Sequence, residues 1–211
     1  MLIPRQILYY LRPFTSRAHY VKNGLYALSD DRAVLVVYEP SNADGLDGVY
    51  EVDIKAALVG LRNGGMDRYI SIPGKYARVF QGKLLTSEVL WDKLKFDGDG
   101  TGSIELEPGE VVKMHGFLEG LYQVSDRARL SITSNGLVLE SKGDDHEVRV
   151  VFNGKPSGSA VASYSLLVLK EVTNIIGIRS ARLLINKQHF GLFEYLTNHG
   201  IIRTYFAPLV E

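Results

Sequence analysis

The chain has 211 residues, of which 45% are hydrophobic and 23% charged, so it can bury a sizeable core in one large domain or in two of about 100 residues. Its 24 basic and 24 acidic residues cancel, so contact with nucleic acid would require charges gathered on one surface. The absence of cysteine excludes disulfides, thiolate metal sites and a cysteine nucleophile. No apolar run approaches the roughly 18 residues of a membrane span. We therefore expect a soluble intracellular protein, nuclear or cytoplasmic according to its host, which a virus could encode.

The first half of the chain is predicted to contain two helices and a series of antiparallel strands. A helix over residues 3–12 has Pro4 in its first turn and ends at Pro13. Asn23-Gly24 separates two short apolar runs and is a strong hairpin signal. Asp53 can cap a second helix that continues to residue 61. Further strands are expected over residues 33–38, 49–52, 69–72, 76–80 and 84–90.

The second half repeats this order. Residues 110–122 are predicted to be helical, with an apolar stripe on one face, and a second hairpin turn is expected at Asn135-Gly136. Three more strands are predicted between Ser180 and Phe206, the last ending near Phe206 because Pro208 cannot donate to a ladder. A constant spacing of 112 residues relates Asn23 to Asn135, Asp53 to Ser165 and Ile72 to Leu184. This spacing predicts an internal duplication.

The end of the chain resembles a known family. The resemblance is to the carboxyl terminus of DNA sliding clamps of the PCNA type. It is carried by Phe193-Glu194-Tyr195, a glycine-containing turn, and Tyr205-Phe206-Ala207-Pro208 followed by an acidic residue. In that family each subunit has two similar domains, and three subunits close a ring. The resemblance implies an α+β fold of two clamp-type domains, each with antiparallel sheets and two helices. The expected ranges are 1–92 for the first domain, 93–107 for an interdomain connector and 108–211 for the second domain.

The resemblance also implies a function. The expected protein is a homotrimeric clamp that encircles double-stranded DNA without reading its sequence and tethers DNA polymerase and other replication or repair enzymes. It is not expected to be an enzyme or to need a cofactor or metal. Sliding requires phosphate contacts from lysine and arginine on helices that face the hole. The candidate DNA-binding residues are Arg5, Arg12, Arg17, Lys55, Arg62, Lys113 and Lys170.

Two further surfaces follow from the same resemblance. The strands over residues 84–90 and 147–152 are candidate sheet edges that would meet between neighbouring subunits. Polymerases and the clamp loader would dock short peptides in a pocket walled by the connector, one strand of the first domain and the tail. One of Tyr205 and Phe206 is expected to close the core instead, since strand neighbours point to opposite faces. The candidate peptide-binding residues are Leu35, Leu94, Phe96, Tyr205, Phe206, Ala207 and Pro208.

Two alternatives remain open. Residues 97–108 fit the opening of an EF-hand loop, with Asp97, Asp99 and Thr101 at its first ligand positions, but Pro108 stands where a bidentate glutamate is required. The favoured interpretation is an acidic linker, and the runner-up is a calcium-binding protein. The second alternative is a hydrolase that uses Asp97 and Asp99 as a carboxylate pair. The five histidines follow no metal-binding or catalytic spacing.

Overall fold

The computed structural model describes residues 2–21, 24–41, 49–59, 69–71, 77–79, 94–96, 100–143, 145 and 147–209. It is an α+β structure in which every strand pairing is antiparallel within these ranges. No helix in the described ranges has the length and apolar character needed to cross a membrane. Arg62, the strand predicted over 84–90, and Asp97 and Asp99 lie outside the described residues.

The first half follows the predicted order closely. Its elements are β1 (Leu2–Pro4), α1 (Arg5–Leu11), β2 (Arg17–Val21), β3 (Gly24–Leu28), β4 (Val34–Pro40), β5 (Tyr50–Asp53), α2 (Ile54–Val59), β6 (Tyr69–Ser71) and β7 (Ala77–Val79). The start of the first helix was predicted too early, because Ile3 and Pro4 extend along β6 and the helix begins at Arg5. The predicted cap of the second helix is confirmed: the backbone N–H of Ala56 donates to Asp53 Oδ1 at 2.8 Å.

The second half follows a similar order, with one additional short strand, β12 (Lys155–Ser157), between its two helices. Its elements are β8 (Gly102–Leu106), α3 (Pro108–Leu121), β9 (Arg127–Thr133), β10 (Gly136–Lys142), β11 (Glu147–Phe152), β12, β13 (Ala160–Ser165), α4 (Leu166–Thr173), β14 (Ile178–Ile185), β15 (Gly191–Thr197) and β16 (Gly200–Phe206). The last three strands form the predicted meander, and the final strand ends at Phe206 as expected.

Strand β8 occupies residues that the sequence assigned to the connector and to the possible calcium loop. Ile104 lies in its middle with a fully buried side chain, and Pro108 opens α3. An EF-hand loop needs residues 102–108 to wrap around an ion, whereas here they pair with β14 and enter a helix. Residues 102–106, predicted to be part of a connector, are therefore a strand of the large sheet, and the second half of the possible calcium loop is not a loop.

The strand order repeats between the halves. The first half contains the order β4-β3-β2-β5, and the four-stranded sheet of the second half has the order β11-β10-β9-β13. Likewise β1 pairs with β6 and β8 pairs with β14. The hairpins begin their second strands at Gly24 and Gly136, 112 residues apart, and an added Cβ at either would lie 2.5 or 2.6 Å from a carbonyl oxygen of the next strand.

Matching hydrogen bonds support the same correspondence. After α1, Thr15 Oγ1 donates to the carbonyl of Arg17 at 3.1 Å, and after α3, Ser125 Oγ donates to the carbonyl of Arg127, also at 3.1 Å. The second helix of each half is tied to this turn by its first backbone N–H: Ile54 donates to Ser16 and Leu166 to Asp126. The two halves therefore share local hydrogen bonding as well as element order.

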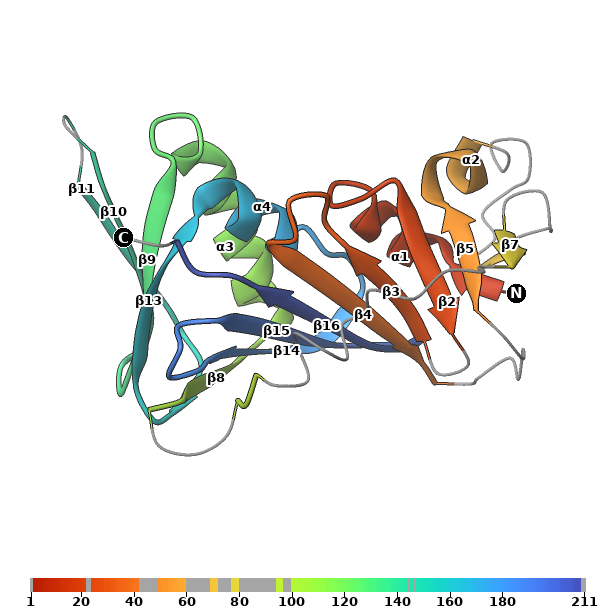
Figure 1. Ribbon diagram of the computed structural model, residues 1–211. Helices are drawn as coiled ribbons and strands as arrows, with labels where there is room; N and C mark the ends of the chain where they lie inside the picture. The colour runs from red at the N-terminus through yellow and green to blue at the C-terminus, as the bar shows by residue number, and fades with distance from the viewer. Residues whose placement is uncertain are drawn as a thin grey trace.

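The halves are joined through one continuous sheet. Strand β16 pairs with β4 along its whole length, from Gly200 opposite Pro40 to Phe206 opposite Val34, which gives a ten-stranded sheet in the order β12-β8-β14-β15-β16-β4-β3-β2-β5-β7. Figure 1 shows α1, α3 and α4 behind this sheet, and the four-stranded sheet at its left end. A single core cluster fills the space between sheet and helices and contains residues from all four helices. We call that side of the large sheet its helical face and the opposite side its outer face.

Candidate partner-binding surface and helical face

An apolar surface lies on the outer face of the ten-stranded sheet. Leu35 and Val37 of β4 form its buried centre, and they are separate from the main core. Because side chains alternate along a strand, Val34 and Val36 point into the helical core while Leu35 and Val37 point outward. The partly buried residues packed against this centre are Tyr26, Leu28, Leu94, Phe190 and Tyr205.

The register explains why these residues meet. Leu28 lies opposite Leu35, Leu35 opposite Tyr205, and Tyr205 opposite Leu192. Directly opposed residues of adjacent antiparallel strands lie about 5 Å apart, so they form an apolar row across β3, β4, β16 and β15. Residues 94–96 reach this row, because the Phe96 and Tyr205 rings lie with their centroids 5.9 Å apart. The structure thus brings together four of the predicted peptide-binding residues: Leu35, Leu94, Phe96 and Tyr205.

Phe206 is excluded from this surface. Its side chain is fully buried on the helical face, with its ring centroid 4.8 Å from that of Tyr164 and 5.9 Å from that of Phe193. The assignment of Phe206 to the peptide pocket was therefore wrong, and the expectation that one of the two aromatic neighbours closes the core is confirmed. The reason is the strand alternation, which sends Tyr205 outward and Phe206 inward.

Ala207 and Pro208 continue from β16 toward the second sheet. The N–H of Ala207 donates to the carbonyl of Ala33, and the N–H of Leu209 donates to the carbonyl of Ser163 on β13, each at 2.9 Å. Pro208 lines a cavity of about 650 Å³ with Leu209, Arg129, Val161, Ala162, Ser163 and His189. Residues 208–209 therefore line a hollow together with β13 and the turn between β14 and β15.

His189 shapes that hollow through an unusual backbone conformation. Its φ of 68° lies in the left-handed region, which is uncommon for a residue with a side chain. Its Nδ1 lies 2.9 Å from the carbonyl oxygen of Val161, and since a carbonyl only accepts, Nδ1 carries the proton and donates. Its own carbonyl accepts a 2.7 Å hydrogen bond from the Tyr164 hydroxyl. The histidine thus joins the β14–β15 turn to β13.

A charged row, which we did not predict from the sequence, borders the apolar row. Arg203 Nε donates to Glu194 at 2.8 Å, and its Nη1 donates to Glu39 at 2.6 Å, which links β15, β16 and β4. Burial favours the neutral form of Arg203, but the hydrogen bonds that its guanidinium donates to the two carboxylates, together with their negative charge, outweigh burial and raise the pKa of Arg203. The alternation of Arg182, Glu194 and Arg203 with apolar residues in three consecutive strands is the sequence signal that could have revealed this row.

The candidate DNA-binding residues fall into two groups. Arg5, Arg12, Lys55, Lys113 and Lys170 lie in or beside the four helices. Arg17 does not belong with them: Ala18 and Tyr20 of β2 enter the core, so Arg17 and His19 point to the outer face, where Arg17 lies 3.7 Å from Glu51. The structure thus separates Arg17 from the helical set.

The helical cations differ in what they contact. Arg5 Nη2 donates to the Tyr9 hydroxyl at 3.1 Å. Lys113 lies 3.5 Å from Glu110, one turn away in α3. Lys170 lies 3.1 Å from Glu171 and stands over the Tyr122 ring, 4.6 Å from its centroid. Arg12 and Lys55 are exposed and have no ion-pair partner among the described residues.

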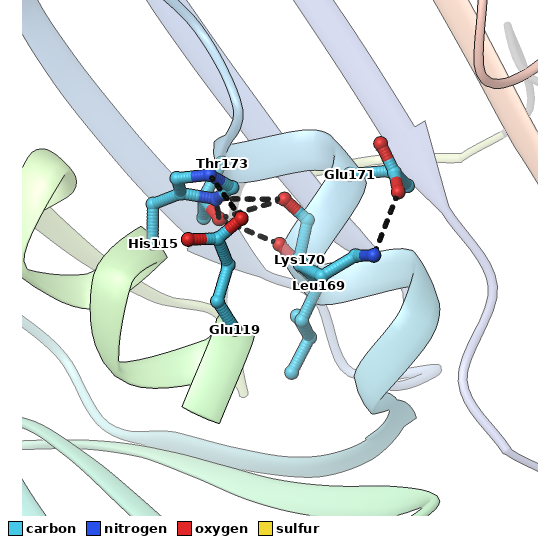
Figure 2. A network of polar contacts seen from close by, with 6 residues as sticks. All are labelled: His115, Glu119, Leu169, Lys170, Glu171 and Thr173. Carbon is cyan, nitrogen blue, oxygen red and sulfur yellow. Dashed lines mark hydrogen bonds and ion pairs between the residues drawn. The ribbon is translucent and has the colours of Figure 1, made fainter. Parts of the chain in front are cut away.

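A polar network connects α3 to α4, as Figure 2 shows. His115 Nδ1 lies 3.1 Å from the carbonyl oxygen of Lys170 and 3.3 Å from Thr173 Oγ1. Its Nε2 lies 3.8 Å from Glu119. Because Nδ1 faces a carbonyl, it donates a hydrogen bond, and the histidine fixes the second pair of helices against each other.

Within the described ranges, no three His, Asp or Glu side chains come together in a way that could hold a metal ion. No model of a known protein family matches the chain, and no curated protein matches it either.

Proposed function

We propose that this protein is a DNA sliding clamp of the PCNA type, a ring that encircles duplex DNA and tethers polymerase and other enzymes to it. The observation that carries the proposal is the repeated topology. Within the described residues each half begins with the order strand, helix, three strands, and a further strand then leads into a second helix; the second half inserts the short strand β12 before that further strand. Residues of all four described helices join one core cluster on the helical face of the joint sheet. Repetition of such a unit around an axis would line a hole with helices and leave the sheets outside.

Closure of the ring would use free sheet edges. Strand β11 is at the edge of the four-stranded sheet, and its side chains are exposed or partly buried apart from Phe152. An edge strand offers unpaired N–H and C=O groups to another chain. A head-to-tail contact between this edge and a different edge of the next subunit closes a ring when the rotation permits. The partner edge in this proposal is the strand predicted over 84–90.

The outer face would recruit partners. The apolar row around Leu35 and Tyr205, together with the cavity beside Pro208, would accept a short peptide with aromatic or aliphatic anchors. Burial of one aromatic anchor could supply roughly 2 to 4 kcal/mol, enough to dominate the affinity. DNA polymerase and a clamp loader are the partners we propose for this surface.

Two measurements test the proposal without a cognate polymerase. The first is light scattering at about 10 µM, which should give the mass of a trimer, because a specific interface of standard size holds at that concentration. The second is topological: protein threaded onto linear DNA whose ends are then blocked should stay bound after dilution and leave once a restriction enzyme opens an end. A monomer in solution, or release at the same rate from blocked and open DNA, would refute the clamp proposal.

The peptide surface has its own test. Tyr205→Ser and Leu35→Ser should each lower the affinity of the assembled trimer for a peptide taken from the carboxyl terminus of the cognate polymerase at least tenfold. Fluorescence anisotropy measures this affinity. Phe206 must remain, since its loss would open the core. Ser180→Ala, an exposed change elsewhere on the outer face, is the control and should leave the affinity unchanged. Equal binding by all variants would place the peptide elsewhere.

A further inference from the structure

We propose that duplex DNA is contacted mainly through the helices of the first half, α1 and α2, whereas α3 and α4 present a surface neutralised by their own carboxylates. This inference rests on the proposed clamp function and specifies which part of each subunit holds the phosphates. From the sequence alone, the basic residues on the helices were predicted to act as one DNA-binding set. Their contacts in the structure divide them into the cations of α1 and α2 and the cations of α3 and α4.

The cations of the first half are available to a ligand. Arg12 is exposed at the carboxyl end of α1, and Lys55 is exposed in the first turn of α2. Neither makes an ion pair among the described residues. Neither α1 nor α2 contains an acidic residue, and the carboxylate of Asp53, which precedes α2, accepts the capping hydrogen bond of Ala56. A phosphate approaching this side would meet positive charge with little internal competition.

The cations of the second half are compensated within the chain. Each has a carboxylate within 3.5 Å: Glu110 for Lys113, and Glu171 for Lys170. Only 22% of the Lys170 side chain is exposed. Glu119 adds a further negative charge on α3. With two lysines against three glutamates, α3 and α4 together carry a net negative charge and attract phosphates little.

One exposed stripe of α3 also lacks groups that could bind a phosphate. Val112, Gly116, Gly120 and Val124 recur every four residues and so follow one side of the helix and the turn after it. Val112 is 65% and Val124 62% exposed, and a Cβ added at Gly116 or Gly120 would meet no atom within 4 Å. This stripe has no cation, and its two glycines leave extra room.

The consequence for a ring would be three basic patches alternating with three neutral surfaces. Few phosphates would be held at one time, so each contact could exchange for the next along the duplex. The neutral surfaces would make few contacts with the DNA backbone.

The test measures how the affinity of the trimer for a labelled 30-base-pair duplex depends on salt, by fluorescence anisotropy. Arg12→Ala with Lys55→Ala should lower the slope of log K against log salt by at least about 1.8, since each lost phosphate contact removes about 0.9. Lys113→Ala with Lys170→Ala should leave the slope unchanged. Arg17→Ala removes one positive charge from the outer face and is the control, which should leave the slope unchanged.

Two gains of charge extend the test. Gly116→Lys and Gly120→Lys should tighten binding and steepen the slope, because they place cations in open space on the neutral surface. If the Lys113/Lys170 variant lost as much slope as the Arg12/Lys55 variant, the proposal that α1 and α2 make most of the DNA contacts would be refuted. That result would leave the clamp function standing, provided that the parent protein is a trimer retained on end-blocked DNA. Failure of that retention would instead refute the proposed function itself.

Discussion

The hydroxyl of Tyr10 provides a direct test of how the two halves are coupled. Tyr10 lies in α1 of the first half, and its hydroxyl lies 2.9 Å from the carbonyl oxygen of Val172 in α4 and 2.8 Å from Thr204 Oγ1 in β16. Its single proton must go to the carbonyl, so the Thr204 hydroxyl donates to Tyr10. Burial raises the pKa of Tyr10, which keeps this donor protonated throughout the stable pH range.

The substitution Tyr10→Phe should destabilise the protein by about 2 kcal/mol. The carbonyl of Val172 keeps its second donor, the Tyr195 hydroxyl at 2.8 Å, but the fully buried Thr204 hydroxyl loses its acceptor. An unsatisfied buried hydroxyl costs about 1 to 3 kcal/mol. Thr204→Val should cost less, about 1 kcal/mol, because Tyr10 keeps its carbonyl acceptor.

The double variant Tyr10→Phe/Thr204→Val should be more stable than the sum of the single losses predicts, by about 1 kcal/mol, since no orphaned hydroxyl remains. Urea unfolding at fixed protein concentration measures these free energies, and the Tyr10→Phe melting temperature should fall by roughly 4 to 8 °C. Tyr9→Phe is the control: Tyr9 is 47% exposed in the same helix, and the change should be within about 0.5 kcal/mol. A cost for Tyr10→Phe no larger than that of the control, with an additive cycle, would refute the proposed coupling of the halves.

The remaining predictions concern the core, a turn and the acid limit of stability. Phe206→Ala should destabilise the protein by about 3 to 5 kcal/mol because its ring is fully buried, whereas Tyr205→Ala should cost much less, as urea unfolding can measure. Gly191→Ala should also destabilise it, because the new methyl group would occupy the place of the Phe206 ring, and repacking in Gly191→Ala/Phe206→Leu should recover part of the loss. The hydrogen bond from the Ser29 hydroxyl, helped by a backbone N–H, lowers the pKa of Asp31, so its carboxylate stabilises the fold above about pH 3.9 and this contribution disappears as the pH falls through the lowered folded-state pKa. Asp31→Asn should therefore be less stable than the parent at pH 7 and converge with it near pH 2, and an equal difference at both pH values would contradict this assignment.

Local signals in the sequence determined most of the secondary structure. These signals are the glycines at the start of β3 and β10, the Asp53 cap and the apolar stripe of α3. Each acts over a few residues, so its effect can be predicted without knowledge of the tertiary structure. The first helix shows the limit of such reading. Pro4 is equally suited to a first helical turn and to an extended residue, and pairing with β6, more than sixty residues away, decided for the strand.

The candidate sites depended on longer-range information. Strand alternation predicted that Tyr205 and Phe206 would separate, but only the ten-stranded sheet decided which of them entered the core. The pairing of Glu110 with Lys113 could be anticipated from their spacing on one helix. The position of Lys170 over Tyr122 could not, because it requires the packing of α3 against α4.

The sequence by itself determined most of the order of the elements, the repeat of 112 residues and the helix or strand that holds Arg5, Lys55, Lys113, Lys170, Leu35 and Tyr205. Only the tertiary structure decided that β4 and β16 join the halves into one sheet, which puts Leu35 beside Tyr205. It also decided that Ala18 and Tyr20 of β2 enter the core, which sends Arg17 to the opposite face from Arg12 and Lys55. The reason is physical: local propensity and periodicity act within a few residues, whereas the pairing of strands 160 or more positions apart depends on which edges the two packed halves leave free.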